Sequence, residues 1–313
     1  MKDLTKEPVK TLFLGTDWES VETLEELDKD PRFNVVGVIT QPDKEVGRKQ
    51  VLTPSKVKVF SLENNIPVFH TEKKEEKYKE ALEKFKPELI VCKAFGEIIP
   101  SFFLEYPQYK AINVHFSLLP KYRGAVPIQK AILGGEKRTG ITIMLMSEGL
   151  DEGDILAQFE EDILKSDTNQ SLRDRLVKKS RYVLPEVLEQ WINGEITPQK
   201  QDDSLATYCW QKDISKDKAE IDWENENPEY IERKIRAMIP WPVAWTIMNG
   251  KRMKIYKASL ENLKRDLNPG EVFIEKGKLY IGTKNLSKVL YVEELQLEGK
   301  KRMNSQDYIR GLQ

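Results

Sequence analysis

Short apolar runs and amphipathic charged stretches alternate along the first half of the chain. The apolar runs cover residues 11–15, 35–39, 66–69, 89–92, 111–115 and 141–146. Between the first two, Val21, Leu24 and Leu27 recur at helical spacing. Continuous apolar strands separated by helices are typical of a parallel sheet with both faces covered. The pattern therefore predicts an α/β, Rossmann-like domain with a mostly parallel sheet, whose ligands bind at the carboxyl ends of the strands.

The pattern changes after residue 170. A long amphipathic helix is predicted over 172–192, with Gly194 as its stop and Pro185 expected to kink it or divide it in two. Asn227 and Pro228 are typical of a helix start. Beyond residue 242, short strands alternate with turns, among them the hairpin signal Asn249-Gly250. We predict a catalytic-type α/β domain over 1–195, a polar linker over 196–212 and a small OB-like β-barrel over 213–313.

Composition narrows the class of protein. The 313 residues are 39% hydrophobic and 32% charged, which allows a core, and no apolar stretch is long enough to span a membrane. Because the first residues are charged and lack an apolar signal region, we expect a cytoplasmic protein. With two cysteines and two histidines, a zinc cluster or a disulfide scaffold is not expected, and we predict no metal. The absence of GxGxxG and GxxxxGK[ST] patterns argues against dinucleotide binding and P-loop chemistry.

The near-neutral total charge hides an asymmetry. Residues 1–205 carry 30 Lys and Arg against 35 Asp and Glu, a net of −5, and residues 206–313 carry the remaining 20 and 16, a net of +4. The excess is modest. It leaves open an anionic partner for the second half of the chain.

The segment most informative about chemistry is residues 112–125. Side chains alternate along a strand, so Asn113 and His115 project from the same face, near the carboxyl end of a predicted strand. A carboxamide beside an imidazole suits the stabilisation of an oxyanion on a carbonyl. Asp151 lies in an acidic, glycine-flanked loop after another strand, where a carboxylate can orient the imidazole and help to move protons. An acyl-transfer site is one interpretation; a structural histidine beside a solvated acidic turn is the other.

Several blocks resemble the methionyl-tRNA formyltransferases, within the wider group of 10-formyltetrahydrofolate-dependent transferases, over nearly the whole chain. The matching blocks are Thr40-Gln41-Pro42-Asp43, Asn113-Val114-His115, Ser117-Leu118-Leu119-Pro120, Tyr122-Arg123-Gly124-Ala125, Gly149-Leu150-Asp151, Ile221-Asp222-Trp223, Pro240-Trp241-Pro242 and Gly299-Lys300-Lys301-Arg302-Met303. The Asn-x-His and Asp set marks the wider group. The blocks in the second half narrow the resemblance to the tRNA enzymes.

The resemblance implies formyl transfer from 10-formyltetrahydrofolate to the α-amine of methionyl-initiator tRNA, for translation initiation, by an enzyme expected to be a monomer. Asn113 and His115 would hold the oxyanion, and Asp151 would orient His115 and help to move the amine proton. The folate would contact three segments, formed by Phe95, Gly96, Ile98 and Ile99, by Ser117, Leu118, Leu119 and Pro120, and by Glu148, Gly149 and Leu150. The tRNA would contact Arg48, Lys49, Lys300, Lys301 and Arg302.

The chain departs from the family pattern in two places. Trp18 stands in the loop that borders the methionyl pocket in the family, where it either replaces the usual phenylalanine or packs. Lys93 and Glu97 make the next loop more polar; Lys93 is expected either to be a partly exposed side chain or to alter the pterin site. A sugar-nucleotide N-formyltransferase with the same folate site remains an alternative, as does a non-catalytic folate- or RNA-binding relative.

Overall fold

A computed structural model describes residues 7–47 and 49–312. The chain forms two compact units, each built from separate stretches of sequence. The first contains Met1–Arg123, Gly140–Glu161 and Asp174–Thr207, and the second contains Gly124–Thr139, Asp162–Arg173 and Tyr208–Gln313. The domain boundaries drawn from the sequence remain a prediction.

The first unit is organised around a seven-stranded sheet with the strand order β10-β9-β7-β6-β1-β2-β5. Its strands are β1 (Val9–Gly15), β2 (Phe33–Ile39), β5 (Val68–Phe69), β6 (Leu89–Lys93), β7 (Ala111–His115), β9 (Arg138–Leu145) and β10 (Ile155–Asp162). The pairs β1–β2, β1–β6, β2–β5 and β6–β7 are parallel, and β9 runs antiparallel to β7. The predicted α/β class with a mostly parallel sheet is therefore confirmed.

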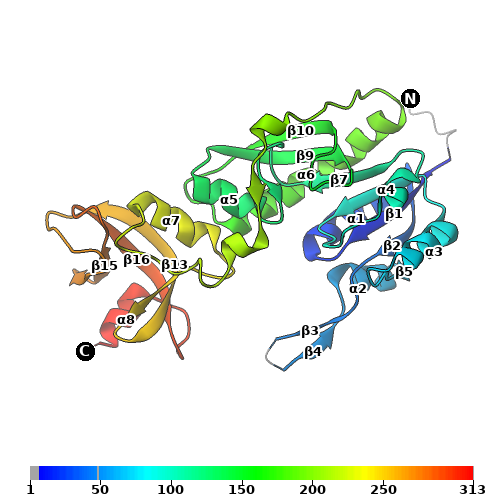
Figure 1. The fold of residues 1–313 in the computed structure, drawn as a ribbon. Coiled ribbons are helices and arrows are strands. Elements are labelled where there is room, and N and C mark those ends of the chain that lie inside the picture. The colour runs from blue at the N-terminus through cyan, green and yellow to red at the C-terminus, as the bar shows by residue number, and fades with distance from the viewer. Residues whose placement is uncertain (1–6, 48, 313) are drawn as a thin grey trace. The chain divides into compact units, whose positions relative to one another are not determined.

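Helices accompany the sheet, and a hairpin projects from it (Figure 1). The helices are α1 (Trp18–Lys29), α2 (Lys56–Glu63), α3 (Glu75–Phe85), α4 (Ser101–Glu105) and α6 (Asn169–Ile192). The hairpin is formed by β3 (Lys44–Val46) and β4 (Val51–Thr53), which pair in antiparallel register. It follows the carboxyl end of β2.

Two outcomes were expected at Pro185, a kink or a division, and the structure excludes the division of helix α6. The helix runs through this proline without interruption. Proline removes one main-chain hydrogen bond from a helix interior. Leu184 and Leu188 on either side are fully buried, and the burial of this apolar stripe offsets the lost hydrogen bond.

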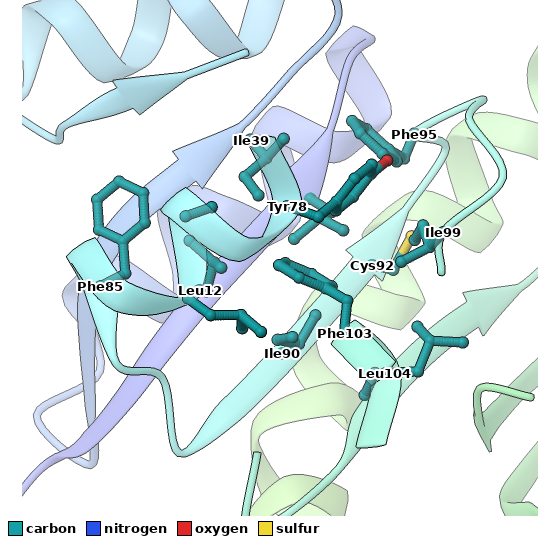
Figure 2. Packing of buried hydrophobic residues seen from close by; sticks show 14 residues of the cluster. Leu12, Ile39, Tyr78, Phe85, Ile90, Cys92, Phe95, Ile99, Phe103 and Leu104 are labelled. Atoms are coloured by element: carbon teal, nitrogen blue, oxygen red, sulfur yellow. The ribbon is translucent and has the colours of Figure 1, made fainter. Parts of the chain in front are cut away.

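One apolar core cluster of the first unit joins the sheet to α3 and α4 (Figure 2). Leu12 and Ile90, from neighbouring strands, are fully buried beneath Tyr78 and Phe103, whose rings meet edge to face at 5.0 Å. This packing holds β1 and β6 rigidly in place. Both strands end at the carboxyl edge of the sheet, where ligands bind in such folds.

The second unit contains an antiparallel sheet with the strand order β12-β13-β16-β15-β14, to which β17 adds beside β16. Its strands are β12 (Trp245–Met248), β13 (Lys251–Asn262), β14 (Val272–Glu275), β15 (Lys278–Gly282), β16 (Lys288–Leu297) and β17 (Met303–Asn304). Asn249 and Gly250, both with positive φ, form the two-residue turn between β12 and β13, as predicted. The sheet encloses a core with α7 (Pro228–Ala237) and α8 (Ser305–Arg310).

The remaining elements are short. They are β8 (Arg123–Gly124), α5 (Pro127–Gly134), the 3-10 turns η1 (Asp203–Leu205) and η2 (Gln211–Ile214), and β11 (Tyr208–Cys209), which pairs with β8. In the described part of the chain, no helix is both long enough and apolar enough to cross a membrane.

Candidate active site

Asn113, His115 and Asp151 meet at the carboxyl end of β7. The Nδ2 atom of Asn113 donates to Asp151 Oδ1 at 3.4 Å, and His115 Nδ1 lies 3.5 Å from Asp151 Oδ2. The first two residues share a face because side chains alternate along β7. Asp151 reaches them from the loop after β9, where its φ of +52° is uncommon for a residue with a side chain. The structure thus brings together the three candidate catalytic residues, although Asn113 and Asp151 are 38 positions apart in the sequence.

The second ring nitrogen of His115 faces the main chain. Its Nε2 lies 2.9 Å from the carbonyl oxygen of Tyr122. A carbonyl oxygen accepts and cannot donate, so this contact requires the proton on Nε2. The other nitrogen, Nδ1, then faces Asp151 at a distance longer than a normal N–H···O hydrogen bond. The imidazole is therefore fixed in orientation, with its Nδ1 edge toward the carboxylate.

Glycines allow the loop that carries Asp151 to pass close to its surroundings. A Cβ atom at Gly153 would lie 1.9 Å from the carbonyl oxygen of Leu145, and one at Gly149 would lie 1.6 Å from the Glu152 carboxylate. The main chain at 153 therefore runs directly against the end of β9. The predicted folate residues Glu148, Gly149 and Leu150 belong to this loop, and the side chain of Leu150 is 43% exposed.

The segment Ser117–Pro120 is held by hydrogen bonds to β9 and β10. Thr142 Oγ1 donates to the Ser117 carbonyl at 2.6 Å and accepts from the Leu119 N–H at 3.1 Å. Gln158 Nε2 donates to the Leu119 carbonyl at 2.9 Å. These contacts satisfy the buried polar groups of the segment and fix its path after β7. Leu118, whose side chain approaches Gly140, lies between the two anchored positions.

The segment Phe95–Ile99 follows β6, the neighbour of β7. Its main chain is fixed from two sides: Thr16 Oγ1 donates to the Phe95 carbonyl at 3.0 Å, and Gln41 Nε2 donates to the same oxygen at 2.9 Å and to the Gly96 carbonyl at 3.1 Å. Phe95 is buried, whereas Ile98 is 94% exposed. Because Cys92 pairs with Asn113 across the two strands, this segment starts beside the catalytic candidates. The loops after β6 and β7 leave at the same edge of the sheet, and the loop after the antiparallel strand β9 reaches the catalytic candidates through Asp151.

Cys92 lies in the same region and is buried. Burial and, to a smaller extent, the negative charge of Asp151 raise the pKa of the Cys92 thiol to about 12. The thiol is neutral at physiological pH and acts as a small apolar side chain.

Lys93 differs from its expected exposure. Its side chain is 1% exposed, and Nζ donates to Thr23 Oγ1 at 2.9 Å and to Ser180 Oγ at 2.8 Å. The ammonium group also lies 4.8 Å from the centre of the Phe116 ring. The expectation of a partly exposed side chain is wrong, because hydroxyl groups on α1 and α6 receive the charge inside the unit. Trp18, the first residue of α1, is 39% exposed and is therefore accessible to a ligand.

The predicted tRNA-contacting residues lie in both units. Lys49 is exposed in the loop between β3 and β4, and Arg48 lies outside the described residues. Lys300 and Lys301 are exposed after β16. Arg302 stacks on Tyr256, with its guanidinium carbon 4.4 Å from the ring centre, and donates to Glu294 at 2.8 Å.

Sequence analysis did not identify two residues whose side chains connect to the candidate site, Gln201 and Arg123. Gln201, placed in the predicted polar linker, is 6% exposed and donates to the main-chain carbonyl of Asp151 at 2.9 Å. Arg123 is 1% exposed and donates to Gln201 Oε1. Only one feature of the sequence could have indicated a role for Arg123 at the site: it lies eight residues after His115, within the same motif segment.

Known proteins resemble the chain over nearly its whole length. Residues 9–188 match the family model described as formyl transferase, and residues 213–313 match the formyl transferase C-terminal domain. The methionyl-tRNA formyltransferase of Halalkalibacterium halodurans is 45% identical over 305 residues, covering 97% of this chain and 95% of the relative. That of Bacillus subtilis is 42% identical over 306 residues, covering 96% and 94%.

Solved structures share the fold at lower identity. The N-formyltransferase from Helicobacter canadensis, solved with folinic acid and dTDP-3-aminofucose, is 22% identical with a TM-score of 0.68, covering 91% of this chain and 99% of that one. HypX from Aquifex aeolicus, solved with tetrahydrofolic acid, is 19% identical with a TM-score of 0.63, covering 96% of this chain. The chain spans about half the length of HypX, 47%.

Proposed function

The chain belongs to the methionyl-tRNA formyltransferase family, and we propose that it catalyses formyl transfer through Asn113, His115 and Asp151. The formyl donor is 10-formyltetrahydrofolate, and the acceptor is the α-amine of methionyl-initiator tRNA. The observation that carries this proposal is the meeting of Asn113 and His115 with Asp151 at the carboxyl end of β7. The alternative, a sugar-nucleotide N-formyltransferase, has less support, because such an enzyme is only 22% identical to this chain whereas a methionyl-tRNA formyltransferase is 45% identical.

The chemistry follows from the groups at the site. The free amine attacks the formyl carbon and the C=O bond becomes a C–O⁻ single bond. The oxyanion then re-forms C=O as the C–N10 bond of the folate breaks, and N10 takes the proton that the amine loses. One hydrogen of the Asn113 amide is directed to Asp151, and the amide has a second hydrogen to donate to the oxyanion. The Nε2 proton of His115 is committed to the Tyr122 carbonyl, so Nδ1 donates to the oxyanion when the ring carries a proton on both nitrogens, a form that the facing Asp151 carboxylate favours.

The proton removed from the amine must reach N10 of the folate. Asp151 touches both Asn113 and His115, and its carboxylate accepts protons, so it is the group we assign to this transfer. The Nε2–H of His115 is engaged by the Tyr122 carbonyl. That contact leaves the Nδ1 edge of the imidazole to act in the reaction.

We assign the folate to the three segments that converge on the site. Phe95–Ile99 and Ser117–Pro120 are main-chain segments fixed by hydrogen bonds, and Ile98 exposes an apolar side chain that can cover an aromatic ring system. Pre-formed pockets with a few fixed polar groups are typical of small-molecule sites. The solved neighbours that contain tetrahydrofolic acid and folinic acid are consistent with this assignment.

For the tRNA, we propose contacts by Lys49 in the hairpin loop, by Lys300, Lys301 and Arg302, and by Arg48, which lies outside the described residues. Exposed Lys and Arg contact phosphates without reading sequence. Trp18, which is exposed at the start of α1, is proposed to contact the methionyl side chain. We further propose that the enzyme acts in the cytoplasm as a monomer, which sedimentation in solution would test.

The test is a formyl-transfer assay with the purified full chain. The donor is 10-formyltetrahydrofolate, and the acceptors are methionyl-initiator tRNA and a dTDP-linked amino sugar. We expect transfer to the tRNA, with kcat/KM at least about 10³-fold above that for the sugar, since a site built for one acceptor leaves polar groups unpaired with another. Preferential formylation of the amino sugar would reject the proposal.

A further inference from the structure

We propose that Gln201, held by the buried Arg123, is a positioning residue that sets the place of Asp151 in the active site. The inference rests on the function proposed above and adds a residue that acts through Asp151. Gln201 lies 50 residues beyond Asp151 in the sequence, yet its side chain reaches the main chain of the catalytic loop. All the residues involved belong to the first compact unit.

The amide of Gln201 binds the loop at two points. Its Nε2 donates to the Asp151 carbonyl at 2.9 Å and to the Gly153 carbonyl at 2.7 Å. These carbonyls flank Glu152 and mark the place where the loop reverses. Asp151 has a positive φ there, a conformation that surrounding contacts must hold. The two hydrogen bonds supply such contacts, because both carbonyls are tied to one rigid amide group.

Arg123 orients that amide. Its Nε and Nη2 atoms donate to Gln201 Oε1 at 3.1 and 2.8 Å, so the oxygen of the amide points to the guanidinium and the nitrogen points to the loop. A buried guanidinium has donors and no acceptor, which excludes the flipped amide at this place. Arg123 also pairs with Asp203 Oδ1 at 2.7 Å, and the side chain of Asp203 is 72% exposed. The charge of Arg123 thereby selects one orientation of Gln201.

The same short segment also fixes the histidine. The residue before Arg123 is Tyr122, whose carbonyl lies 2.9 Å from His115 Nε2. The main-chain N–H of Tyr122 donates to Thr207 Oγ1 at 2.8 Å, and that of Arg123 donates to the Thr207 carbonyl at 2.8 Å. Residues 122 and 123 thus hold His115 directly and Asp151 through Gln201. A displacement of about 1 Å in such a pair can lower a rate about 100-fold.

The decisive variant is Gln201→Glu in the full chain. The glutamate retains an oxygen for Arg123, and its charge pairs with the guanidinium, so folding is preserved. It loses both N–H donors and sets a carboxylate oxygen against two carbonyls. We expect kcat for methionyl-initiator tRNA to fall about 10- to 100-fold, with the KM for the tRNA within about twofold and the variant still folded by circular dichroism.

Two further measurements separate positioning from general support of the fold. In an Asp151→Ala background, Gln201→Glu should have no further effect on kcat, since a positioning residue acts only through the group that it places. Amide hydrogen exchange should accelerate at residues 149–153 in Gln201→Glu and stay unchanged elsewhere in the unit. The exchange experiment keeps the test valid even if the variant loses stability.

The matched control is Asp203→Ala, which removes the exposed partner of Arg123 and leaves Gln201 in place. It should retain kcat within about twofold, because it touches nothing in the loop. Wild-type kcat in Gln201→Glu, or an equal loss in the Asp151→Ala background, would overturn the positioning role. If the unmodified protein fails to formylate methionyl-initiator tRNA, the proposed function itself fails, whatever the Gln201 variants do.

Discussion

The ammonium group of Lys93 lies 4.8 Å from the centre of the Phe116 ring, and both side chains are buried. Phe116 directly follows His115, so this contact joins the end of β6 to the carboxyl end of β7. The ammonium group also donates to the hydroxyls of Thr23 and Ser180. Lys93 therefore supports the candidate site from within the core of the first unit, through its contact with Phe116.

Truncation of Lys93 should destabilise the protein strongly. Lys93→Ala leaves a cavity and is expected to lower the free energy of unfolding by about 2–5 kcal/mol, as for other large buried side chains. Lys93→Met fills most of the space without a buried charge and should lose less than half of that. Urea denaturation followed by tryptophan fluorescence measures both. Equal losses in the two variants would contradict this account of the site.

Removal of the Asn113 amide should cost formyl transfer without unfolding the protein. Asn113→Ala is expected to lower kcat by about 10²–10³, the usual loss for one oxyanion donor. Asp151→Ala should cost at least as much, and the double variant should be far from additive because both act on one transition state. Steady-state kinetics at saturating substrates tests this. Near-normal turnover of either single variant would remove that residue from the mechanism.

Trp18 offers a test of amino acid recognition. If its exposed side chain contacts the methionyl group, Trp18→Ala should raise the KM for methionyl-initiator tRNA about tenfold, because the complex then buries much less apolar surface. Folate affinity should not change. Trp18→Phe, which retains an aromatic ring, is the matched control. Unchanged tRNA kinetics in Trp18→Ala would show that the side chain only packs.

Because the pKa of the Cys92 thiol is raised in the folded protein, we expect the free energy of unfolding to depend on pH in the alkaline range. Its pKa is raised from 9.0 to about 12 in the folded protein, so the folded state keeps a proton that the unfolded state releases. Stability should fall as the pH rises above 9, by up to about 1.4 kcal/mol per pH unit from this group alone. Cys92→Ala should show a shallower fall over the same range. Parallel curves for the two proteins would refute the assignment.

The exposed basic residues predict a salt-dependent affinity for tRNA. Lys and Arg that neutralise phosphates release counterions, so a double variant with Lys300→Ala and Lys301→Ala should weaken binding. It should also reduce the slope of log K against log salt by about one for each phosphate that is no longer neutralised. Lys49→Ala should act in the same direction. Lys79→Ala, which replaces an exposed lysine paired with Glu75 on α3, is the control and should leave the slope unchanged. Identical slopes in the wild-type protein and all three variants would exclude these phosphate contacts.

Much of the architecture was determined by local sequence. Continuous apolar runs predicted six of the seven strands of the first sheet, all but β10, and Asn249-Gly250 predicted the β12–β13 turn, because these signals depend on strand burial and on positive φ. Alternation also predicted that Asn113 and His115 share one face of their strand. The motif blocks pointed to the methionyl-tRNA formyltransferases, and the relatives at 40–45% identity confirm this membership.

Tertiary structure decided what local patterns cannot encode. Of the kink or division expected at Pro185, the division is absent from the described helix α6, because burial of Leu184 and Leu188 outweighs the local cost of the proline. The charge of Lys93 predicts a surface residue, yet its ammonium group donates to hydroxyls of α1 and α6 in the core. Gln201 was predicted to lie in a polar linker, yet its side chain donates to the main chain of the loop that carries Asp151. Each outcome depends on groups brought together across long stretches of chain, and only the packed fold specifies which groups meet.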